Sequence, residues 1–494
     1  MRRILAFLIK TVLLAAVIAV TALLAWAWQS RGMPDLHPWH TVTLDNEFTA
    51  SDATSGTTLE DYLAREDRLF AELDRKIYQR AGVDGDWVYS RYRAGGPQDP
   101  RWAGRNWNRT FEMVPDKIRA GALLLHGLTD SPYSLRRVAE VLRARGFYVL
   151  GLRLPGHGTI PGALTQVKWE DWVAASRIGA RHVRDRIGPD LPFVLAGYSN
   201  GGGLSVKYAL DSLIDKDLPV PNRLLLFSPE IGIDSLARIA DSHKLLSFMP
   251  YFAKFKWLSI MPEYDPFKYN SFPKNAAQEA WEVTYALRSQ IQEARKAGQY
   301  GDFPDVLTFL SWTDSTVSTA DTISLLYDQL ENDGSELVIF DVNRFDQIKP
   351  FIPAANESPL KQLEARGDLP YQLTVITNAS GDSREVAQRS KPPHSDTIVT
   401  ELLPVEWPRS VYSLSHVAVP FPPDDPVYGE GDSGSPDYHG LPLGSLAPRG
   451  ETRLLTAPLS QLMRLRHNPF FSYVEDRLNT EIDAAYAKAA RAGD

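Results

Sequence analysis

The sequence predicts an α/β fold in which a mostly parallel central sheet is flanked by helices. Short apolar segments, among them Ala120–Leu125 and Phe147–Leu152, alternate with longer segments of helical periodicity. Strands that are apolar throughout are typical of parallel sheets covered by helices on both faces. A third observation is a glycine-rich turn at residues 197–203, which joins an apolar segment to a helix-compatible one.

The composition is that of a globular protein without cysteine chemistry. The 494 residues are 44% hydrophobic and 23% charged, which suits one large domain with insertions or two to three average domains. The absence of cysteine excludes disulfides, thiolate zinc sites and a cysteine nucleophile. The net charge of −8 disfavours nucleic acid, whose binding requires a basic face. We therefore expect no nucleic-acid partner, and the oligomeric state stays open.

Residues 1–28 predict a membrane anchor. Thr11–Trp28 is an uninterrupted apolar segment, just long enough to cross the hydrocarbon core of a bilayer. Arg2, Arg3 and Lys10 precede it and would stay on the cytoplasmic side. We expect a single-pass anchor in a bacterial-type inner membrane, with the rest of the chain on the periplasmic side. The alternative is a cleaved signal peptide and a secreted protein, because Ala25-Trp26-Ala27 fits a small-x-small cleavage site.

The main domain is predicted to span residues 58–494, after a linker at residues 29–57 that is rich in proline, serine and threonine. Apolar residues at helical spacing predict a helix from Leu59 to Arg80, and Asp86–Tyr92 resembles a first strand. The later strands are expected at residues 120–125, 147–152, 193–197, 223–229, 306–312 and 336–340, with helices between them. An amphipathic helix from about Phe471 to Arg491 closes the chain.

Two segments interrupt this alternation. Residues 231–304 are rich in aromatic and aliphatic side chains, and we interpret them as a helical cap over the carboxyl edge of the sheet. Residues 345–405 are polar and proline-rich and form an additional insertion. Within it, residues 371–377 and 400–403 are candidates for an extra hairpin.

The glycine-rich turn has the pattern G-x-S-x-G, which is typical of a nucleophile elbow. A strand that turns sharply into a helix strains the backbone of the central serine, Ser199, and lifts its hydroxyl clear of the sheet. Gly197 and Gly201 have no Cβ atom to collide with the neighbouring strand and helix. The alternative is an ordinary strand–turn–helix connection.

A serine nucleophile requires a base, a carboxylate that orients the base, and donors for the oxyanion. Asp314 follows the strand near residues 306–312, and His416 comes later in the chain. Glu230 and Asp234, which follow the preceding strand, are alternatives for the carboxylate.

The oxyanion donors are expected on two loops. One is the backbone N–H of Asn200, directly after the nucleophile, and the other is that of Leu128, after the strand at residues 120–125. Gly127 would allow the backbone to approach a substrate carbonyl.

The segments LLLHGLTDSP, RLPGHG, WEDW, LAGYSNGG and SLSH together resemble the α/β-hydrolase superfamily. The chain is most similar to its group of monoacylglycerol lipases, carboxylesterases, lysophospholipases and serine aminopeptidases. This resemblance covers roughly residues 120–230 and 305–418. It implies the α/β-hydrolase fold, with Ser199 as nucleophile, Asp314 as acid and His416 as base. It also implies that His126 and His157 shape loops. The sequence has no Walker A pattern and no H-E-x-x-H motif, so we expect no metal or cofactor.

The expected function is hydrolysis of carboxylic esters, with acyl lipids or small esters as substrates, through an acyl-enzyme on Ser199. A serine aminopeptidase is one alternative, in which Glu263 or Asp265 of the cap would bind the substrate amine. An acyltransferase is another, because an alcohol can replace water as the acceptor. The alternative from a different class is a non-catalytic, membrane-anchored interaction protein.

Overall fold

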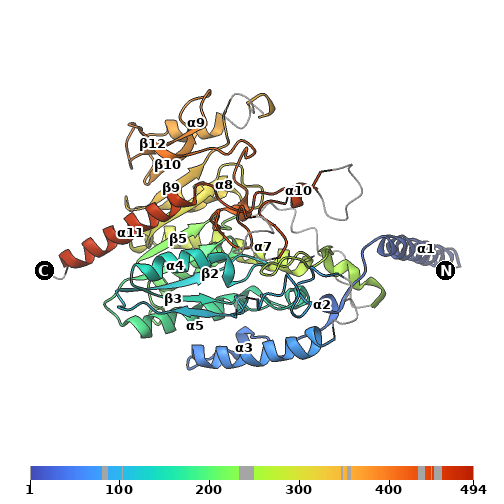
Figure 1. Ribbon diagram of the computed structural model, residues 1–494. Coiled ribbons are helices and arrows are strands. Elements are labelled where there is room, and N and C mark those ends of the chain that lie inside the picture. Colours follow the sequence, from blue (N-terminus) through green and yellow to red (C-terminus); the bar gives the residue numbers. More distant parts are fainter. Residues whose placement is uncertain are drawn as a thin grey trace.

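A computed structural model describes residues 2–80, 87–102, 104–232, 250–345, 349–352, 358–431, 440–446, 448–449 and 459–492. Its centre is a ten-stranded sheet with the strand order β1-β3-β2-β4-β5-β8-β9-β10-β11-β12 (Figure 1). The strands are β1 (Phe111–Met113), β2 (Ala120–Leu125), β3 (Phe147–Leu152), β4 (Phe193–Tyr198), β5 (Arg223–Phe227), β8 (Asp305–Ser311), β9 (Glu336–Phe340), β10 (Gln372–Asn378), β11 (Glu385–Lys391) and β12 (Val399–Glu406). The seven strands from β3 to β10 in this order are parallel, whereas β1, β11 and β12 are antiparallel to their neighbours.

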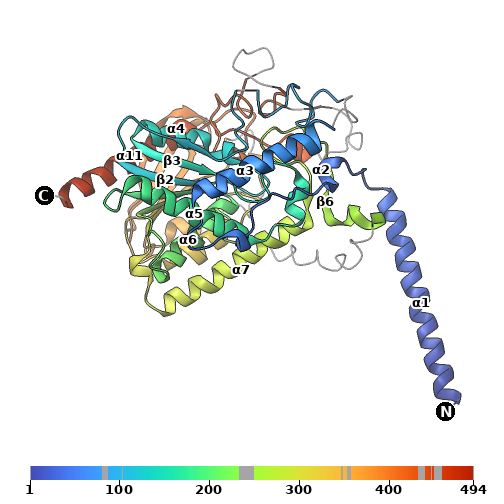
Figure 2. The ribbon, with the colours of Figure 1, turned by 90° about the horizontal axis from the view of Figure 1, so that it is seen from below.

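Helices cover both faces of the sheet, as the apolar strands predict. Figure 2 shows α4 (Arg136–Ala144) on one side and α5 (Trp169–Ile187), α6 (Asn200–Ile214) and α7 (Lys274–Lys296) on the other. Alternate residues of β2 point to opposite faces: Leu123 and Leu125 pack with α5 and α6, while Ala122 and Leu124 pack with α4 and α11 (Phe471–Ala492). The two faces therefore carry two separate hydrophobic cores.

Residues 345–405 widen the sheet rather than adding a separate hairpin. β10 pairs in parallel with β9, and β11 and β12 continue outward as an antiparallel meander, with α9 (Ser358–Ala365) beside them. The predicted pairing of residues 371–377 with 400–403 is wrong, because β11 lies between these two segments.

The segment predicted as a helical cap, residues 231–304, is only partly helical where it is described. The 3₁₀ segment η7 (Pro250–Lys256) leads into a two-stranded ribbon of β6 (Trp257–Ser259) and β7 (Phe272–Pro273). The long helix α7 then packs beside α6 and contributes to the core of that sheet face. Residues 233–249, including Asp234, lie outside the described residues.

The N-terminal helix α1 (Arg2–Arg31) extends away from the body of the protein (Figure 2). Among the residues that the structure describes, no helix is long and apolar enough to span a membrane. The anchor predicted at residues 1–28 is therefore not supported.

Two other N-terminal predictions are wrong. Residues 29–57 are not a free linker, because Trp39, in α2 (Pro38–Thr41), and Phe48 are buried against the body. Residues 87–92, expected in a first strand, form turns, and the first strand is β1. The helix expected from Leu59 is present as α3 (Leu59–Leu73), continued by one turn of π-helix over Asp74–Tyr78.

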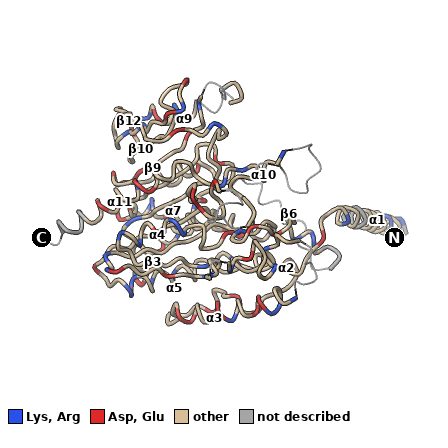
Figure 3. Tube along the Cα trace, viewed as in Figure 1, with Lys and Arg blue, Asp and Glu red and all other residues tan. Residues whose placement is uncertain are grey.

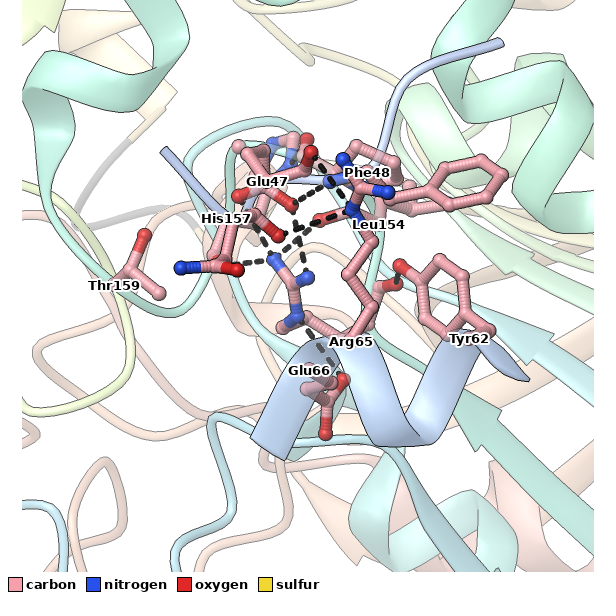
Figure 4. A network of polar contacts seen from close by, with 12 residues as sticks. Glu47, Phe48, Tyr62, Arg65, Glu66, Leu154, His157 and Thr159 are labelled. Carbon is pink, nitrogen blue, oxygen red and sulfur yellow. Dashed lines mark hydrogen bonds and ion pairs between the residues drawn. The ribbon is translucent and has the colours of Figure 1, made fainter. Parts of the chain in front are cut away.

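A buried ion network fixes this N-terminal region to the loop after β3 (Figure 4). The Arg153 guanidinium donates to Glu66 of α3 at 3.0 Å and to both carboxylate oxygens of Glu47 at 2.9 and 3.2 Å. The same guanidinium donates to the carbonyl oxygen of His157 at 3.0 Å. The hydroxyl of Tyr62 donates to the backbone carbonyl oxygen of Arg153. Burial disfavours the Arg153 charge, but Glu47, Tyr62 and Glu66 outweigh it and raise the pKa of Arg153.

Candidate active site

Ser199 stands at a strained turn between β4 and α6. Its backbone angles are φ 54° and ψ −120°, a conformation that residues other than glycine rarely adopt. Two backbone hydrogen bonds join the turn to β5 and the residues that follow it. The Ser199 N–H donates to the carbonyl oxygen of Phe227 at 3.0 Å, and the Glu230 N–H donates to the carbonyl oxygen of Ser199 at 2.9 Å. The hydroxyl therefore projects from the end of the sheet on a fixed backbone.

Gly197 and Gly201 allow this turn to be so tight. A Cβ atom at Gly197 would overlap the carbonyl oxygen of Gly201, and a Cβ atom at Gly201 would overlap that of Leu125 in β2. Neither glycine has a positive φ, so the requirement comes from the close approach of backbones rather than from the dihedral angle.

The structure brings Ser199, His416 and Asp314 together. The Ser199 hydroxyl lies 2.9 Å from Nε2 of His416, and Nδ1 of His416 lies 2.8 Å from Oδ2 of Asp314. Because an ionised carboxylate only accepts hydrogen bonds, Nδ1–H is the donor to Asp314, and Nε2 is left to accept from the serine. Ser199 and His416 are only 7% and 4% exposed.

Asp314 is held in its ionised form. Oδ1 accepts from the backbone N–H groups of Thr316 at 2.8 Å and Val317 at 3.0 Å. Burial opposes its ionisation, but His416 and these N–H groups outweigh burial and lower the pKa of Asp314. The turn Asp314–Val317 therefore supplies hydrogen-bond donors to its own carboxylate.

Glu230, the other described candidate for the acid, is buried near the same site. Among the described residues it makes no hydrogen bond or ion pair with His416, and its Oε2 atom has no hydrogen-bond partner. Burial, together with the Asp314 charge, raises the pKa of Glu230 to about 7. Of these two carboxylates, Asp314 is the one that contacts His416.

The predicted oxyanion donors flank the serine. We call residues 126–131, which follow β2, the HG loop. A Cβ atom at Gly127 would lie 3.1 Å from Cβ of Ser199, so this loop touches the nucleophile. Among the described residues, the N–H groups of Leu128 and Asn200 donate no hydrogen bond to the protein, and Asn200 also begins α6, where the helix dipole favours negative charge.

Comparison with known proteins agrees with this geometry. Residues 122–401, more than half of the chain, match the model of the alpha/beta hydrolase family. The chain belongs to this family. Over 89 residues, this α/β hydrolase is also 35% identical to a thermostable monoacylglycerol lipase of Bacillus sp. (strain H-257). That match covers 18% of this chain and 34% of the relative, so it spans about a third of the lipase.

Two solved structures are similar at low identity. A structure of the metagenome-derived lipolytic enzymes LipS and LipT is 19% identical, with a TM-score of 0.38, and the match covers 48% of this chain and 88% of that one. A monoacylglycerol lipase of Paleococcus ferrophilus is 17% identical, with a TM-score of 0.35, and the match covers 47% and 88%. At such scores these likenesses add nothing to the family match.

His126 and His157 of the α/β hydrolase lie close to the site but shape its loops. His126 accepts from the Leu154 N–H at 3.0 Å through Nε2, and its Nδ1 lies 2.9 Å from the carbonyl oxygen of Gly127. It therefore joins the HG loop to the loop after β3. Burial lowers the pKa of His126 well below its usual value and that of His157 to about 3, so both rings are neutral.

Glu263 and Asp265, the carboxylates considered for an amine site, already accept hydrogen bonds from neighbouring groups. We call residues 260–271, between β6 and β7, the cap loop. Glu263 accepts from the backbone N–H groups of Asn270 and Ser271 at 3.0 and 2.8 Å. Asp265 accepts from the backbone N–H groups of Phe267 and Lys268 and from the hydroxyl of Tyr428. Both carboxylates stabilise the cap loop.

Sequence reasoning missed two charged residues beside the site, Asp130 of the HG loop and Lys268 of the cap loop. Their side chains form an ion pair of 3.0 Å. Asp130 could have been found from the sequence, because it lies two residues after Leu128, a predicted oxyanion donor. Nothing in the sequence indicates that the side chain of Lys268 reaches Asp130. In the described residues, no group of three or more histidine, aspartate or glutamate side chains is arranged to hold a metal ion.

Proposed function

We propose that this protein is a serine hydrolase that cleaves carboxylic esters, with acyl lipids as the main substrate class. The observation that carries the proposal is the chain of hydrogen bonds from Ser199 through His416 to Asp314, at 2.9 and 2.8 Å. Membership of the alpha/beta hydrolase family supports the reaction class. The partial match to a monoacylglycerol lipase supports the choice of acyl lipids.

In the first half of the reaction, Ser199 attacks the carbonyl carbon of the ester while His416 Nε2 accepts the serine proton. Asp314 stabilises the imidazolium that forms and keeps its Nδ1–H directed away from the serine. The Leu128 and Asn200 N–H groups bind the oxyanion of the tetrahedral intermediate. His416 then gives the proton to the leaving alcohol, and the acyl group stays on Ser199.

In the second half, water attacks the acyl-enzyme and His416 takes one of its protons. Collapse of the second tetrahedral intermediate releases the carboxylic acid, and the same proton returns to Ser199. An alcohol in place of water would give acyl transfer. No observation favours the aminopeptidase alternative, because Glu263 accepts from N–H groups of the cap loop and Asp265 accepts from the cap loop and from Tyr428. A periplasmic location stays a prediction from the sequence.

The test is turnover of a substrate panel by the purified full chain. The panel contains p-nitrophenyl esters of increasing acyl length, a monoacylglycerol, a lysophospholipid and aminoacyl amides. We expect ester and acyl-lipid turnover that is lost in Ser199→Ala, with little turnover of the amides. Ser228→Ala is the matched control, because Ser228 is also a buried serine after a neighbouring strand and its hydroxyl has no partner among the described residues. Turnover of amides alone, or unchanged ester turnover in Ser199→Ala, would contradict the proposal.

A further inference from the structure

A carboxylate that the reaction described above does not use lies directly beside the nucleophile. Asp130, in the HG loop, is 5% exposed. A Cβ atom built on Gly127 would lie 2.8 Å from Oδ2 of Asp130 and 3.1 Å from Cβ of Ser199. Since both atoms are within about 3 Å of the same point, the carboxylate and the serine are no more than about 6 Å apart, a distance at which buried charges interact strongly.

An unpaired negative charge at this position would oppose the reaction. The carbonyl oxygen becomes negative in the transition state, and the donors proposed for it include the N–H of Leu128, on the same loop as Asp130. A buried carboxylate nearby raises the energy of that oxyanion unless a cation cancels the carboxylate charge.

Lys268 supplies this cation from a distant part of the sequence. Its ammonium group lies 3.0 Å from Oδ2 of Asp130. Its own backbone N–H donates to Asp265, and the N–H of the next residue, Tyr269, donates to the carbonyl oxygen of Thr129 at 2.8 Å. The cap loop thus holds the HG loop by one ion pair and one backbone hydrogen bond. Thr129 has a φ of 66°, a conformation that needs such support in a residue other than glycine.

We propose that Lys268 is a positioning residue for the reaction: it neutralises Asp130 beside Ser199 and holds the HG loop in the geometry that binds the oxyanion. This inference rests on the proposed function, since it presumes an oxyanion at Leu128 and Asn200. It gives the cap loop a defined part in catalysis through its contacts with the HG loop.

The proposal has a signature in the pH dependence of kcat. The titratable groups facing Asp130 are Lys268 and Asp265 of the cap loop, His416, Tyr198 of β4, and Tyr428. Burial raises the pKa of Asp130, and Lys268 opposes this rise. Removal of Lys268 therefore moves the ionisation of Asp130 to higher pH. As the pH rises through this ionisation, the unpaired charge forms and kcat falls.

The experiment compares kcat and KM of the full chain with those of Lys268→Met and of the double variant Asp130→Asn/Lys268→Met, from mildly acidic to mildly alkaline pH. For Lys268→Met we expect kcat to fall roughly tenfold or more at alkaline pH, with a smaller loss at acidic pH and little change in KM. The double variant has no charge to neutralise, so it should recover most of kcat and lose the extra pH dependence. Lys254→Met is the matched control, since Lys254 precedes the cap loop but pairs with Asp35, away from the site.

Either of two results would overturn the role of Lys268 and leave the proposed function standing. One is a kcat for Lys268→Met within about twofold of the wild type at every pH, and the other is a double variant no faster than Lys268→Met. Recovery in the double variant also excludes misfolding as the cause of the loss. If the wild type itself turns over no ester, the proposed function fails, and this inference fails with it.

Discussion

The backbone N–H of Asn343, just after β9, donates a hydrogen bond of 2.7 Å to the carbonyl oxygen of Tyr412. The chain therefore returns from the sheet extension to the point at which it left the core. His416 follows four residues after Tyr412, so the segment that carries it starts beside the end of β9, and the ring reaches Ser199. The hydroxyl of Ser311, at the end of β8, donates to the carbonyl oxygen of Leu414 at 2.8 Å and fixes the same segment from the side of Asp314.

Asn343→Ala should weaken this closure. The Asn343 side chain is buried, donates to the carbonyl oxygen of Val411 at 3.0 Å and accepts from the N–H of Phe345 at 3.1 Å. Its loss leaves buried backbone groups unpaired, so the free energy of unfolding should fall by about 1–3 kcal/mol. Because His416 loses part of its support, ester turnover should fall several-fold.

Urea unfolding and kcat measure these two effects. Ser380→Ala is the control, because Ser380 lies at an exposed turn of the same extension. Equal stability and turnover of Asn343→Ala and the wild type would show that the closure does not position His416.

The elbow should tolerate no side chain at Gly201. A Cβ atom there would overlap the carbonyl of Leu125, so Gly201→Ala must displace β2 or α6 and separate Ser199 from the HG loop. We expect a loss of several kcal/mol in unfolding free energy and near-complete loss of ester turnover. In Gly56→Ala, the added Cβ meets no atom within 4 Å, and stability should change by less than about 0.5 kcal/mol. Thermal unfolding and turnover of the two variants, measured side by side, distinguish crowding at Gly201 from a general effect of replacing glycine.

Local sequence patterns were sufficient for the centre of the fold. Strands buried on both faces are apolar throughout, so β2, β3, β4 and β5 could be recognised from single segments. The elbow could be recognised as well, because its glycines and its serine lie within five residues. The roles assigned to Ser199, Asp314 and His416 remain predictions that the geometry supports.

Features that depend on distant contacts could not be recognised. Residues 29–57 have the composition of a linker, yet Trp39 and Phe48 are buried and Glu47 pairs with Arg153, a residue more than 100 positions away. The outermost strand, β12, is exposed over most of its length, so it lacks the apolar pattern of the central strands. The pairing of Lys268 with Asp130 joins residues far apart in the sequence, and no local pattern encodes it.

The ion network around Arg153 should contribute strongly to stability. Arg153→Met leaves two carboxylates, Glu47 and Glu66, without their buried cation. The cost expected for breaking a buried ion pair in this way is about 3–5 kcal/mol of unfolding free energy. Arg366→Met, which removes the partly exposed partner of Asp328 and Asp368, should cost less than about 1 kcal/mol. Chemical denaturation compares the two, and similar losses would mean that burial of the Arg153 network does not govern its contribution. Figure 3 shows that acidic and basic residues alternate along the Cα trace of the described residues, with no large segment of a single sign.

Glu230 should make stability depend on pH. Its pKa is about 7 in the folded protein, against an ordinary value of 4.5 for an exposed glutamate, so the folded state retains the proton to higher pH. The free energy of unfolding should therefore fall as pH rises from about 4.5 to about 7, by about 3 kcal/mol in total. Glu230→Gln should match the wild type near pH 4 and exceed it in stability above pH 7. Urea unfolding across this range checks the sign, and a constant difference between the two proteins would contradict the assignment.

The central claim is that Ser199 is the nucleophile, activated by His416. The most direct measurement is mass spectrometry of the full chain after reaction with a fluorophosphonate, followed by mapping of the modified peptide. The account predicts one adduct per chain on Ser199, no adduct in Ser199→Ala, and strongly slowed labelling in His416→Ala although the serine is present. An adduct on another residue, or unchanged labelling of Ser199→Ala, would contradict the account.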